Sequence, residues 1–239
     1  MSMHEFDELL ACSDTLSGYD RWAPSYDYEP SAVVSATSWV FDRAPLGCAD
    51  CDVLELGCGT GRHAQRVIGD GARSYLGLDG SQGMLAIAAH RYYDPRVSFG
   101  AVDLLAPFPT TRQFDFALIV LVLEHLPTLE PMLVSLARAV RPGGRVRIVD
   151  LHPDRIAAGS AAHFREGSHQ VCFTSFAHSV PMLCASCEAV GFDVVRRDWL
   201  ATDTMVAAVP GLGAHRGQRI LLDLKLTRRQ RDRRGSGQL

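Results

Sequence analysis

The residues best suited to chemistry lie in one short glycine-rich segment, Val53-Leu-Glu-Leu-Gly-Cys-Gly-Thr-Gly-Arg62. Alternate positions hold the glycines Gly57, Gly59 and Gly61. Glycine at such positions lets the backbone turn tightly and approach a ligand closely. A dinucleotide fingerprint requires a further glycine at position 62, where Arg62 stands. The carboxylate of Glu55 would oppose a pyrophosphate but suits a cationic ligand, so the segment predicts a site for a positively charged molecule.

Two further acids extend this predicted site. Asp79 follows Gly61 by 18 residues, where an acid at the end of a second strand can hold both hydroxyls of a ribose. Asp103 lies 24 residues further on and could accept a hydrogen bond from an adenine amino group. Carboxylates for a cation, a ribose and an adenine, in this order and spacing, predict S-adenosylmethionine as the cofactor.

The elements that must position these residues alternate between strand and helix patterns from residue 51 onward. Strands are predicted at 51–56, 74–79, 96–102, 114–123 and 145–150. Helices are predicted at 61–69, from the N-cap Ser81 to about Tyr92, and after a cap at Thr128. This alternation is typical of a doubly wound α/β sheet, whose ligands bind at the carboxyl ends of the strands.

The flanking segments follow other patterns. Residues 151–178 interrupt the alternation and are predicted to form an insertion on the substrate side, with a strand-like stretch at 170–176. After it we expect a helix at 179–190 and closing strands at 192–200 and 219–226. The predicted organisation is an N-terminal lid at 1–50, a main domain at 51–226 and a basic flexible tail at 227–239.

The chain resembles the class I S-adenosylmethionine-dependent methyltransferases. The segments that carry the resemblance are Leu54-Glu-Leu-Gly-Cys-Gly-Thr-Gly61, Gly77-Leu-Asp-Gly-Ser81, Phe114-Asp-Phe-Ala-Leu-Ile-Val-Leu-Val-Leu-Glu-His-Leu126 and Leu136-Ala-Arg-Ala-Val-Arg-Pro-Gly-Gly144. The resemblance implies a seven-stranded, mostly parallel, Rossmann-like sheet with an antiparallel last strand. It is close over 51–150 and looser over 151–226, where Ala189-Val-Gly-Phe192 fits a late helix-to-strand turn.

The resemblance also implies roles for individual residues. Gly57 and Gly59 would border the methionine moiety, Asp79 would hold the ribose, and Asp103 with Leu104 would face the adenine. The full predicted cofactor-binding set is Tyr19, Glu55, Gly57, Cys58, Gly59, Asp79, Gly80, Met84, Asp103, Leu104 and Val120.

The segment Tyr19-Asp-Arg-Trp-Ala-Pro-Ser-Tyr-Asp27 is similar to one that folds over the active site in small-molecule methyltransferases. From residue chemistry alone, ordinary aromatic packing explains it as well. The resemblance implies transfer of a methyl group to a nitrogen, oxygen or carbon of a small metabolite, with natural-product biosynthesis among its settings. The alternatives are a non-catalytic S-adenosylmethionine-binding protein and, less favoured by Arg62 and Glu55, a nicotinamide-dependent oxidoreductase.

Three residues are predicted to lie near the methyl acceptor: Tyr26, His125 and His152. Tyr26 lies in the expected lid, and His125 follows the most apolar strand. His152 belongs to a segment with four histidines in 28 residues, the others being His163, His169 and His178. Histidine can take a proton near neutral pH, but no residue is assigned as a base.

Charge and composition argue against nucleic-acid-binding, membrane and secreted proteins. The formal net charge is −3 and the pI is near 6.3, without the basic footprint of a general nucleic-acid binder. The longest apolar run is eight residues, too short to cross a membrane, and Glu5, Asp7 and Glu8 stand where a signal peptide is basic. We therefore expect a soluble cytoplasmic protein that acts on a small molecule, without nucleic-acid or membrane partners; a homodimer is left open.

The seven cysteines predict neither a disulfide framework nor a metal site. The pairs Cys48/Cys51 and Cys184/Cys187 have zinc-like spacing, but 132 residues separate Cys51 from Cys184. Cys187 also falls on a helical apolar stripe, where cysteine packs as a small hydrophobe. Near the fourth strand only Glu124 could bind magnesium, so no metal is expected.

Overall fold

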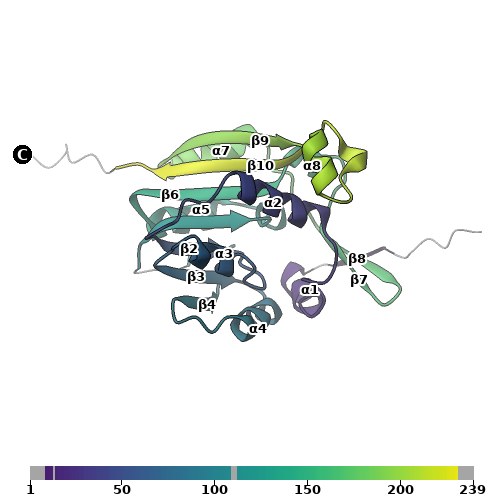
Figure 1. The fold of residues 1–239 in the computed structure, drawn as a ribbon, viewed down its shortest axis with the longest axis horizontal. Helices are drawn as coiled ribbons and strands as arrows, with labels where there is room; N and C mark the ends of the chain where they lie inside the picture. Colours follow the sequence, from purple (N-terminus) through teal and green to yellow (C-terminus); the bar gives the residue numbers. More distant parts are fainter. Residues whose placement is uncertain (1–8, 13, 109–111, 231–239) are drawn as a thin grey trace, which may run out of the picture.

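A seven-stranded sheet forms the centre of the protein (Figure 1), with the strand order β4-β3-β2-β5-β6-β10-β9. The computed structural model describes residues 9–12, 14–108 and 112–230. The strands are β2 (Asp52–Leu56), β3 (Ser74–Asp79), β4 (Val97–Ala101), β5 (Phe114–Val120), β6 (Val140–Leu151), β9 (Phe192–Leu200) and β10 (Arg219–Arg228). β10 runs antiparallel to both neighbours, while the pairs among β2–β6 are parallel. The predicted sheet, with its antiparallel last strand, is confirmed.

Helices cover both faces of this sheet because its central strands are apolar on both sides. The helices of the main domain are α2 (Ala32–Arg43), α3 (Ala64–Gly69), α4 (Gln82–Arg91), α5 (Glu130–Ala139), α7 (Val180–Ala189) and α8 (Asp203–Ala208). One core cluster joins Ala117 and Ile119 of β5 to α5 and α7. A second cluster joins Phe116 and Leu118, the alternate residues of the same strand, to α2, α3 and α8. Strand β5 is therefore buried on both faces, as its unbroken apolar run predicted.

Several element boundaries differ from the sequence predictions. Helix α5 begins at Glu130 after the N-cap Leu129, so the predicted cap at Thr128 is wrong. Strand β5 ends at Val120, because Leu121 adopts a φ of 57° and the chain turns into the short 3-10 helix η1 (Leu123–His125). The cap at Ser81 is confirmed, since its hydroxyl accepts a hydrogen bond from Met84 N.

A smaller sheet, which the sequence analysis did not anticipate as a unit, joins the N-terminal segment to the insertion. Its strands are β1 (Leu9–Cys12), β7 (His163–Glu166) and β8 (His169–Phe173), in the order β1-β8-β7. Helices α1 (Thr15–Trp22) and α6 (Pro153–Ala157) flank these strands in the sequence. Arg21 of α1 forms an ion pair with Glu166 at 3.0 Å. The first part of the predicted lid and the insertion therefore form one cap, whereas α2, also within the predicted lid, packs against the main sheet.

The C-terminal boundary also shifts. Thr227 and Arg228, assigned to the basic tail by sequence, extend strand β10. Residues 231–239 of that predicted tail lie outside the described residues. Among the helices in the described ranges, none has the length and apolar character needed to span a bilayer.

A buried ion pair ties the antiparallel strand to the parallel part of the sheet. Arg147 of β6 and Asp223 of β10 are each about 98% buried and form two hydrogen bonds, at 3.1 and 2.9 Å. Trp199 Nε1 also donates to Asp223, at 3.0 Å, and Arg147 donates to the carbonyl of Ala44. Removing one partner would leave the other charge buried and uncompensated.

We expect Arg147→Met to lower the free energy of unfolding by about 3–5 kcal/mol in urea denaturation, because Asp223 would stay buried without its cation. The double variant Arg147→Met/Asp223→Leu should recover most of this loss. Arg138, exposed on α5, is the control, and Arg138→Met should change stability by less than about 0.5 kcal/mol. Equal effects of the two arginine substitutions would contradict the assignment.

Candidate active site

A cavity of about 480 Å³ opens at the carboxyl ends of β2, β3, β4 and β5 and is covered by α1. The predicted cofactor-binding residues, apart from Glu55, all line it: Tyr19, Gly57, Cys58, Gly59, Asp79, Gly80, Met84, Asp103, Leu104 and Val120. The topology explains this convergence, because parallel strands deliver their carboxyl ends to one edge of the sheet. Its shape is decided by the loop after β2, by Asp79 and by the cap.

The glycine-rich loop needs glycine for two physical reasons. Gly57 and Gly59 have backbone φ values of 69° and 53°, which L-amino acids with a side chain rarely adopt. A Cβ at Gly57 would also lie 2.3 Å from Cγ2 of Val122. Glycine therefore lets this loop pass beneath the chain after β5 and present its backbone to the cavity.

Asp79 fixes the loop from the end of β3. Its carboxylate accepts hydrogen bonds from Gly59 N and Ser81 N, both at 2.8 Å. Burial raises the pKa of Asp79, while these backbone N–H groups favour the ionised form. The Ser81 hydroxyl in turn donates to Asp20 at 2.6 Å, which connects the same site to α1. Asp79 thus organises the cavity wall as well as lining it.

Asp103 and Leu104 follow β4 at the other end of the cavity. Asp103 is exposed, and its Oδ1 accepts a hydrogen bond from Leu105 N at 2.8 Å. Leu104 is buried beside it. This pairing of a hydrogen-bond acceptor with an apolar side chain suits the edge and face of a nucleobase.

Glu55, which the sequence analysis included in the cofactor-binding set, does not line the cavity. It is fully buried below the loop, where it accepts a hydrogen bond from the Tyr75 hydroxyl at 2.5 Å and pairs with His63 Nδ1 at 2.7 Å. The sequence placed this carboxylate at the right strand end, but only the structure shows that it faces inward. Its charge would reach a ligand through the loop rather than by contact.

A second cavity, of about 910 Å³, adjoins the first beneath the cap. Six residues line both cavities: Tyr19, Tyr26, Val34, Arg62, Leu121 and His125. The Tyr19 hydroxyl and His125 Nε2 are 2.8 Å apart and form a hydrogen bond across this boundary. Burial lowers the pKa of His125 to about 4 and raises that of Tyr19, so both side chains are neutral near pH 7. The boundary is polar but uncharged at these two residues.

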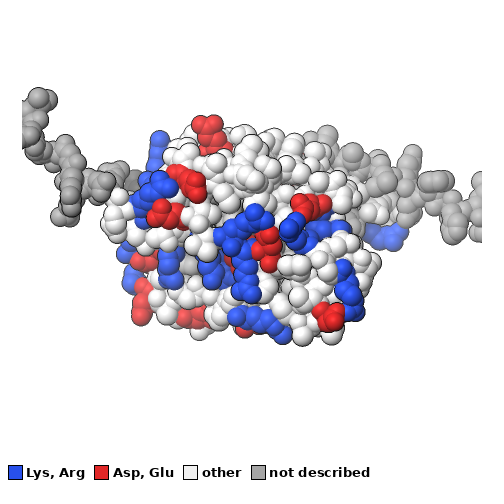
Figure 2. Space-filling view, turned by 90° about the horizontal axis from the view of Figure 1, so that it is seen from above, with Lys and Arg blue, Asp and Glu red and all other residues white. Residues whose placement is uncertain are grey.

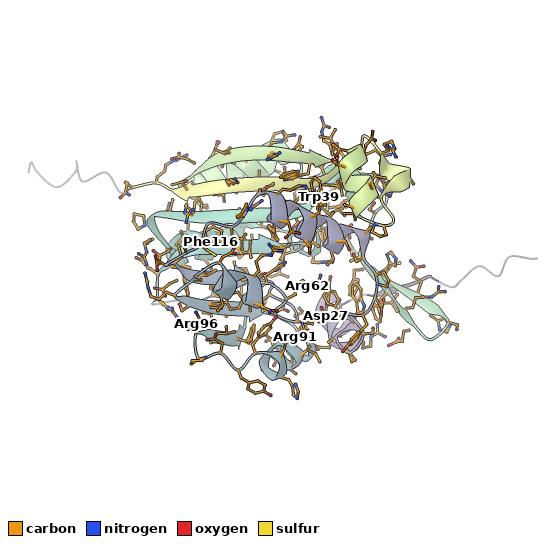
Figure 3. All side chains as sticks on the ribbon, in the orientation of Figure 1. Asp27, Trp39, Arg62, Arg91, Arg96 and Phe116 are labelled. Carbon is orange, nitrogen blue, oxygen red and sulfur yellow. The ribbon has the colours of Figure 1, made fainter. Side chains whose placement is uncertain are left out.

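The cap is held to the glycine-rich loop by an ion cluster that the sequence analysis missed (Figure 3). Asp27 accepts hydrogen bonds from Arg62 and Thr60, both at 3.0 Å, and pairs with Arg91 of α4. Arg62 also lies 5.1 Å from the ring centre of Tyr26. The sequence feature that could have predicted this cluster is Asp27, the last residue of the aromatic segment Tyr19–Asp27.

Of the three predicted acceptor-proximal residues, the structure brings Tyr26 and His125 together and leaves His152 apart. His152 lines neither cavity. It is buried at the N-cap of α6, where Nδ1 accepts from Asp154 N at 3.2 Å. Of the other histidines in the insertion, His163 lines the second cavity, whereas His178 bonds to the carbonyl of Leu126 at 2.8 Å.

Two buried carboxyl groups behind the boundary were also missed as site residues. Glu124 is 5% exposed and lines the second cavity, and Asp150, at the end of β6, is 2% exposed. Burial raises the pKa of Glu124 to about 7 and that of Asp150 to about 6. Asp150 holds the turn after β5, since it accepts hydrogen bonds from Val122 N and Leu123 N. Neither burial nor mutual proximity was visible in the sequence.

The two cysteine pairs occupy different parts of the core. Cys48 and Cys51 belong to the cluster under α2 and α3, whereas Cys187 belongs to the cluster under α5 and α7. Burial raises the pKa of Cys48 to about 11 and that of Cys187 to about 12, which keeps both as thiols. Within the described ranges, no group of three or more His, Cys, Asp or Glu side chains could hold a metal ion.

Comparison with known proteins agrees with this geometry. A family model described as a methyltransferase domain matches residues 53–144. The ubiquinone biosynthesis O-methyltransferase of Thiobacillus denitrificans is 33% identical over 132 residues, which is 52% of this chain and 55% of that protein. This chain spans about half the length of the curated relatives that it matches first, among them a demethylmenaquinone methyltransferase of Tropheryma whipplei.

Solved structures share the fold over nearly the whole chain. A crystal structure of an S-adenosylmethionine-dependent methyltransferase from Mesorhizobium loti has a TM-score of 0.70 at 19% identity, covering 83% of this chain and 100% of that one. The complex of DhpI with SAH has a TM-score of 0.64 at 26% identity, covering 90% and 96% of the two chains. Residues 53–144 therefore match a methyltransferase domain, and the chain has the Rossmann-like fold of S-adenosylmethionine-dependent methyltransferases.

Proposed function

We propose that this protein binds S-adenosylmethionine in the 480 Å³ cavity and transfers its methyl group to a small molecule held in the second cavity. The observation that carries the proposal is the meeting of the two cavities at Tyr19, Tyr26 and His125. A methyl donor on one side of this boundary and an acceptor on the other would be held within reach of each other. Such positioning supplies much of the rate of a displacement reaction.

Each end of the first cavity suits one part of the cofactor. Asp79 would accept hydrogen bonds from the ribose hydroxyls, and the backbone of Gly57 and Gly59 would border the methionine moiety. Asp103 and Leu104 would take the adenine, with Cys58, Gly80, Met84 and Val120 completing the walls. When bound, the cofactor supplies a sulfonium methyl group that is already activated for displacement.

The residues of the boundary orient the acceptor and exclude water. The Tyr19–His125 hydrogen bond fixes both rings, and Tyr26 packs edge-on against Tyr19, with centroids 6.2 Å apart. The ion cluster at Asp27 holds Arg62 beside Tyr26 and closes the cap against the loop. Closure of a site that excludes water strengthens the electrostatic interactions inside it.

Other observations support the predicted partners and location. Basic and acidic side chains are interspersed on the face seen in Figure 2, and the net charge of −3 favours a small molecule over a nucleic acid. The six cysteines whose side chains the structure describes are free thiols, which suits the reducing cytoplasm. One chain lines both cavities, so the proposed reaction needs no second copy; the homodimer stays a prediction.

The direct test is a product analysis. The purified protein is incubated with methyl-labelled S-adenosylmethionine and a metabolite extract, and labelled products are identified by mass spectrometry. A labelled small molecule that requires active protein supports the proposal, whereas cofactor binding without any transfer would favour a non-catalytic binding protein.

We expect Asp79→Ala to weaken binding of S-adenosylhomocysteine by about 10–150-fold, equivalent to about 1.5–3 kcal/mol, in isothermal calorimetry. The variant would lose the proposed ribose contact and the acceptor for Gly59 N and Ser81 N. Asp193→Ala, on the exposed face of β9, is the matched control and should bind as the wild type does. Tight binding of NADH in place of S-adenosylhomocysteine would contradict the proposal.

Two histidine variants distinguish a residue that contacts the acceptor from one that only stabilises the fold. We expect His125→Ala to lower kcat/KM for the identified acceptor by about 10²-fold or more, because the boundary loses its fixed polar group. His152→Ala should instead lower the free energy of unfolding by about 0.5–2 kcal/mol through loss of the α6 cap, with kcat/KM nearly unchanged. Steady-state kinetics and urea unfolding of both variants provide the check. A large loss of kcat/KM in His152→Ala, with little loss in His125→Ala, would show that His152 acts on the acceptor side and His125 does not.

A further inference from the structure

The second cavity is large enough to indicate the kind of acceptor that it holds. Its volume of about 910 Å³ lies near the upper end of the range for cavities that hold drug-sized ligands, which is roughly 300–1,000 Å³. It is also larger than the cavity proposed for the cofactor. An acceptor of a few heavy atoms would leave most of this space unfilled and would gain little from its walls.

One wall of this cavity consists of flat aromatic side chains contributed by both halves of the cap. Trp22 stacks on Phe164, with ring centroids 5.3 Å apart and an interplanar angle of 14°. Tyr26 meets Trp22 edge-on at 4.8 Å. Rings of this kind bind planar apolar ligands through stacked and edge-on contacts.

Two lining side chains contain buried polar atoms without a hydrogen-bond partner among the described residues: Trp22 Nε1 and His125 Nδ1. The Trp22 residue is 9% exposed and the His125 side chain 10% exposed. Buried polar groups are usually paired, so these two side chains keep hydrogen-bonding capacity that oxygen atoms of a bound ligand could use.

The charged side chains of this cavity mostly have partners within the protein. Arg62 is paired with Asp27 at 3.0 Å, and Glu29 accepts a hydrogen bond from Ser25 at 2.6 Å. Arg155 donates to Gln218 and to Ser160, at 2.7 and 3.0 Å. Because these charges are already paired, Arg62, Glu29 and Arg155 are engaged within the protein and not free to bind a charged acceptor. An uncharged acceptor fits this lining better.

Glu124 is the buried carboxyl group of this cavity. It lines the second cavity and not the first, and it directly precedes His125 in η1. Its Oε2 accepts a hydrogen bond from the Ser175 hydroxyl at 2.9 Å, while its Oε1 lies 3.9 Å from His125 Nε2. The carboxylate is therefore held in place next to the boundary where the methyl group would be transferred.

We propose that the second cavity binds an uncharged acceptor with two or more aromatic rings, and that Glu124 takes the proton from its phenolic hydroxyl during methyl transfer. This inference rests on the proposed function and names its substrate class and its base. An oxygen–carbon bond forms as the carbon–sulfur bond breaks, and the bonding electrons pass to sulfur. The phenolic proton passes to the Glu124 carboxylate, which later releases it to solvent.

The acid–base properties of the neighbouring groups support Glu124 in this role. Burial and the charge of Asp150 raise the pKa of Glu124 to about 7, whereas burial lowers that of His125 to about 4. A phenol has a pKa of about 10, so Glu124 is the better matched base near neutral pH. The groups that interact electrostatically with Glu124 or with its neighbour Asp150 are Asp150, His125, Ser175, Tyr19, Tyr26 and His178.

The size and ring character of the acceptor are tested by calorimetry on the protein saturated with S-adenosylhomocysteine. Hydroxyflavones and hydroxyanthraquinones are the multi-ring probes, and ethanolamine and glycine are the small ones. Ala161→Trp fills the second cavity, and Ala157→Trp, on the exposed side of α6, is the matched control. We expect a multi-ring phenol to bind and Ala161→Trp to weaken it at least tenfold, with the control and cofactor binding unchanged.

The role of Glu124 is tested with the phenol that binds. We expect Glu124→Gln to lower kcat by about 10²–10⁴-fold. The loss should be much smaller for a nitro-substituted phenol of the same ring system, which ionises without a base. In the wild type, kcat/KM should rise with pH through about 7, because Glu124 must be ionised, and this rise should be absent from Glu124→Gln.

The outcomes are distinct for the two proposals. If S-adenosylhomocysteine does not bind to the wild type, the proposed function fails. If it binds, but the small amines bind and no multi-ring phenol does, or if Ala161→Trp binds the phenols normally, the acceptor class is wrong. Equal losses in Glu124→Gln for both phenols, or a retained rise through pH 7, would overturn Glu124 as the base and favour Asp150 as the titrating group.

Discussion

The arrangement of the site depends on one half-buried carboxylate, that of Asp79, and on the hydrogen bonds that it accepts from two backbone N–H groups. Gly59 N belongs to the loop after β2, and Ser81 N belongs to the turn that starts α4. A single side chain thus fixes the glycine-rich loop to the next strand of the sheet. Ser81 extends the connection, because its hydroxyl accepts from Met84 N and donates to Asp20 of α1. The floor of the cavity and the helix that covers it are therefore held by one set of hydrogen bonds.

The cap extends this arrangement to the acceptor side. Strand β1 pairs with β8, so the segment that begins at Leu9 and the insertion after β6 form one structural unit. Aromatic contacts between Trp22, Phe164 and Phe173 fill the space between them. Tyr19 connects this unit to the main domain through its hydrogen bond to His125. The boundary between the two cavities is consequently built from both parts of the chain.

The electrostatic character of the site follows from burial. His125 and Tyr19 are kept neutral because desolvation disfavours their charged forms. The charge of Arg62, which approaches the boundary, is matched by that of Asp27. The neutral side chains of Tyr19 and His125, next to a cationic methyl donor, would not stabilise the donor's positive charge before the methyl group is transferred. Glu124 and Asp150, whose pKa values burial raises to about 7 and about 6, are groups there whose charge changes near physiological pH.

The sequence by itself determined the sheet and most of the first cavity. Local signals were sufficient there: an unbroken apolar run for β5, a cap at Ser81, glycines where φ is positive, and acids at strand ends. Only the tertiary structure decided that Glu55 faces inward to Tyr75 and His63, that His152 caps a helix, and that Asp27 and Glu124 join the site. These outcomes depend on contacts between residues far apart in the chain and on burial. Neither leaves a periodic or local pattern in the sequence.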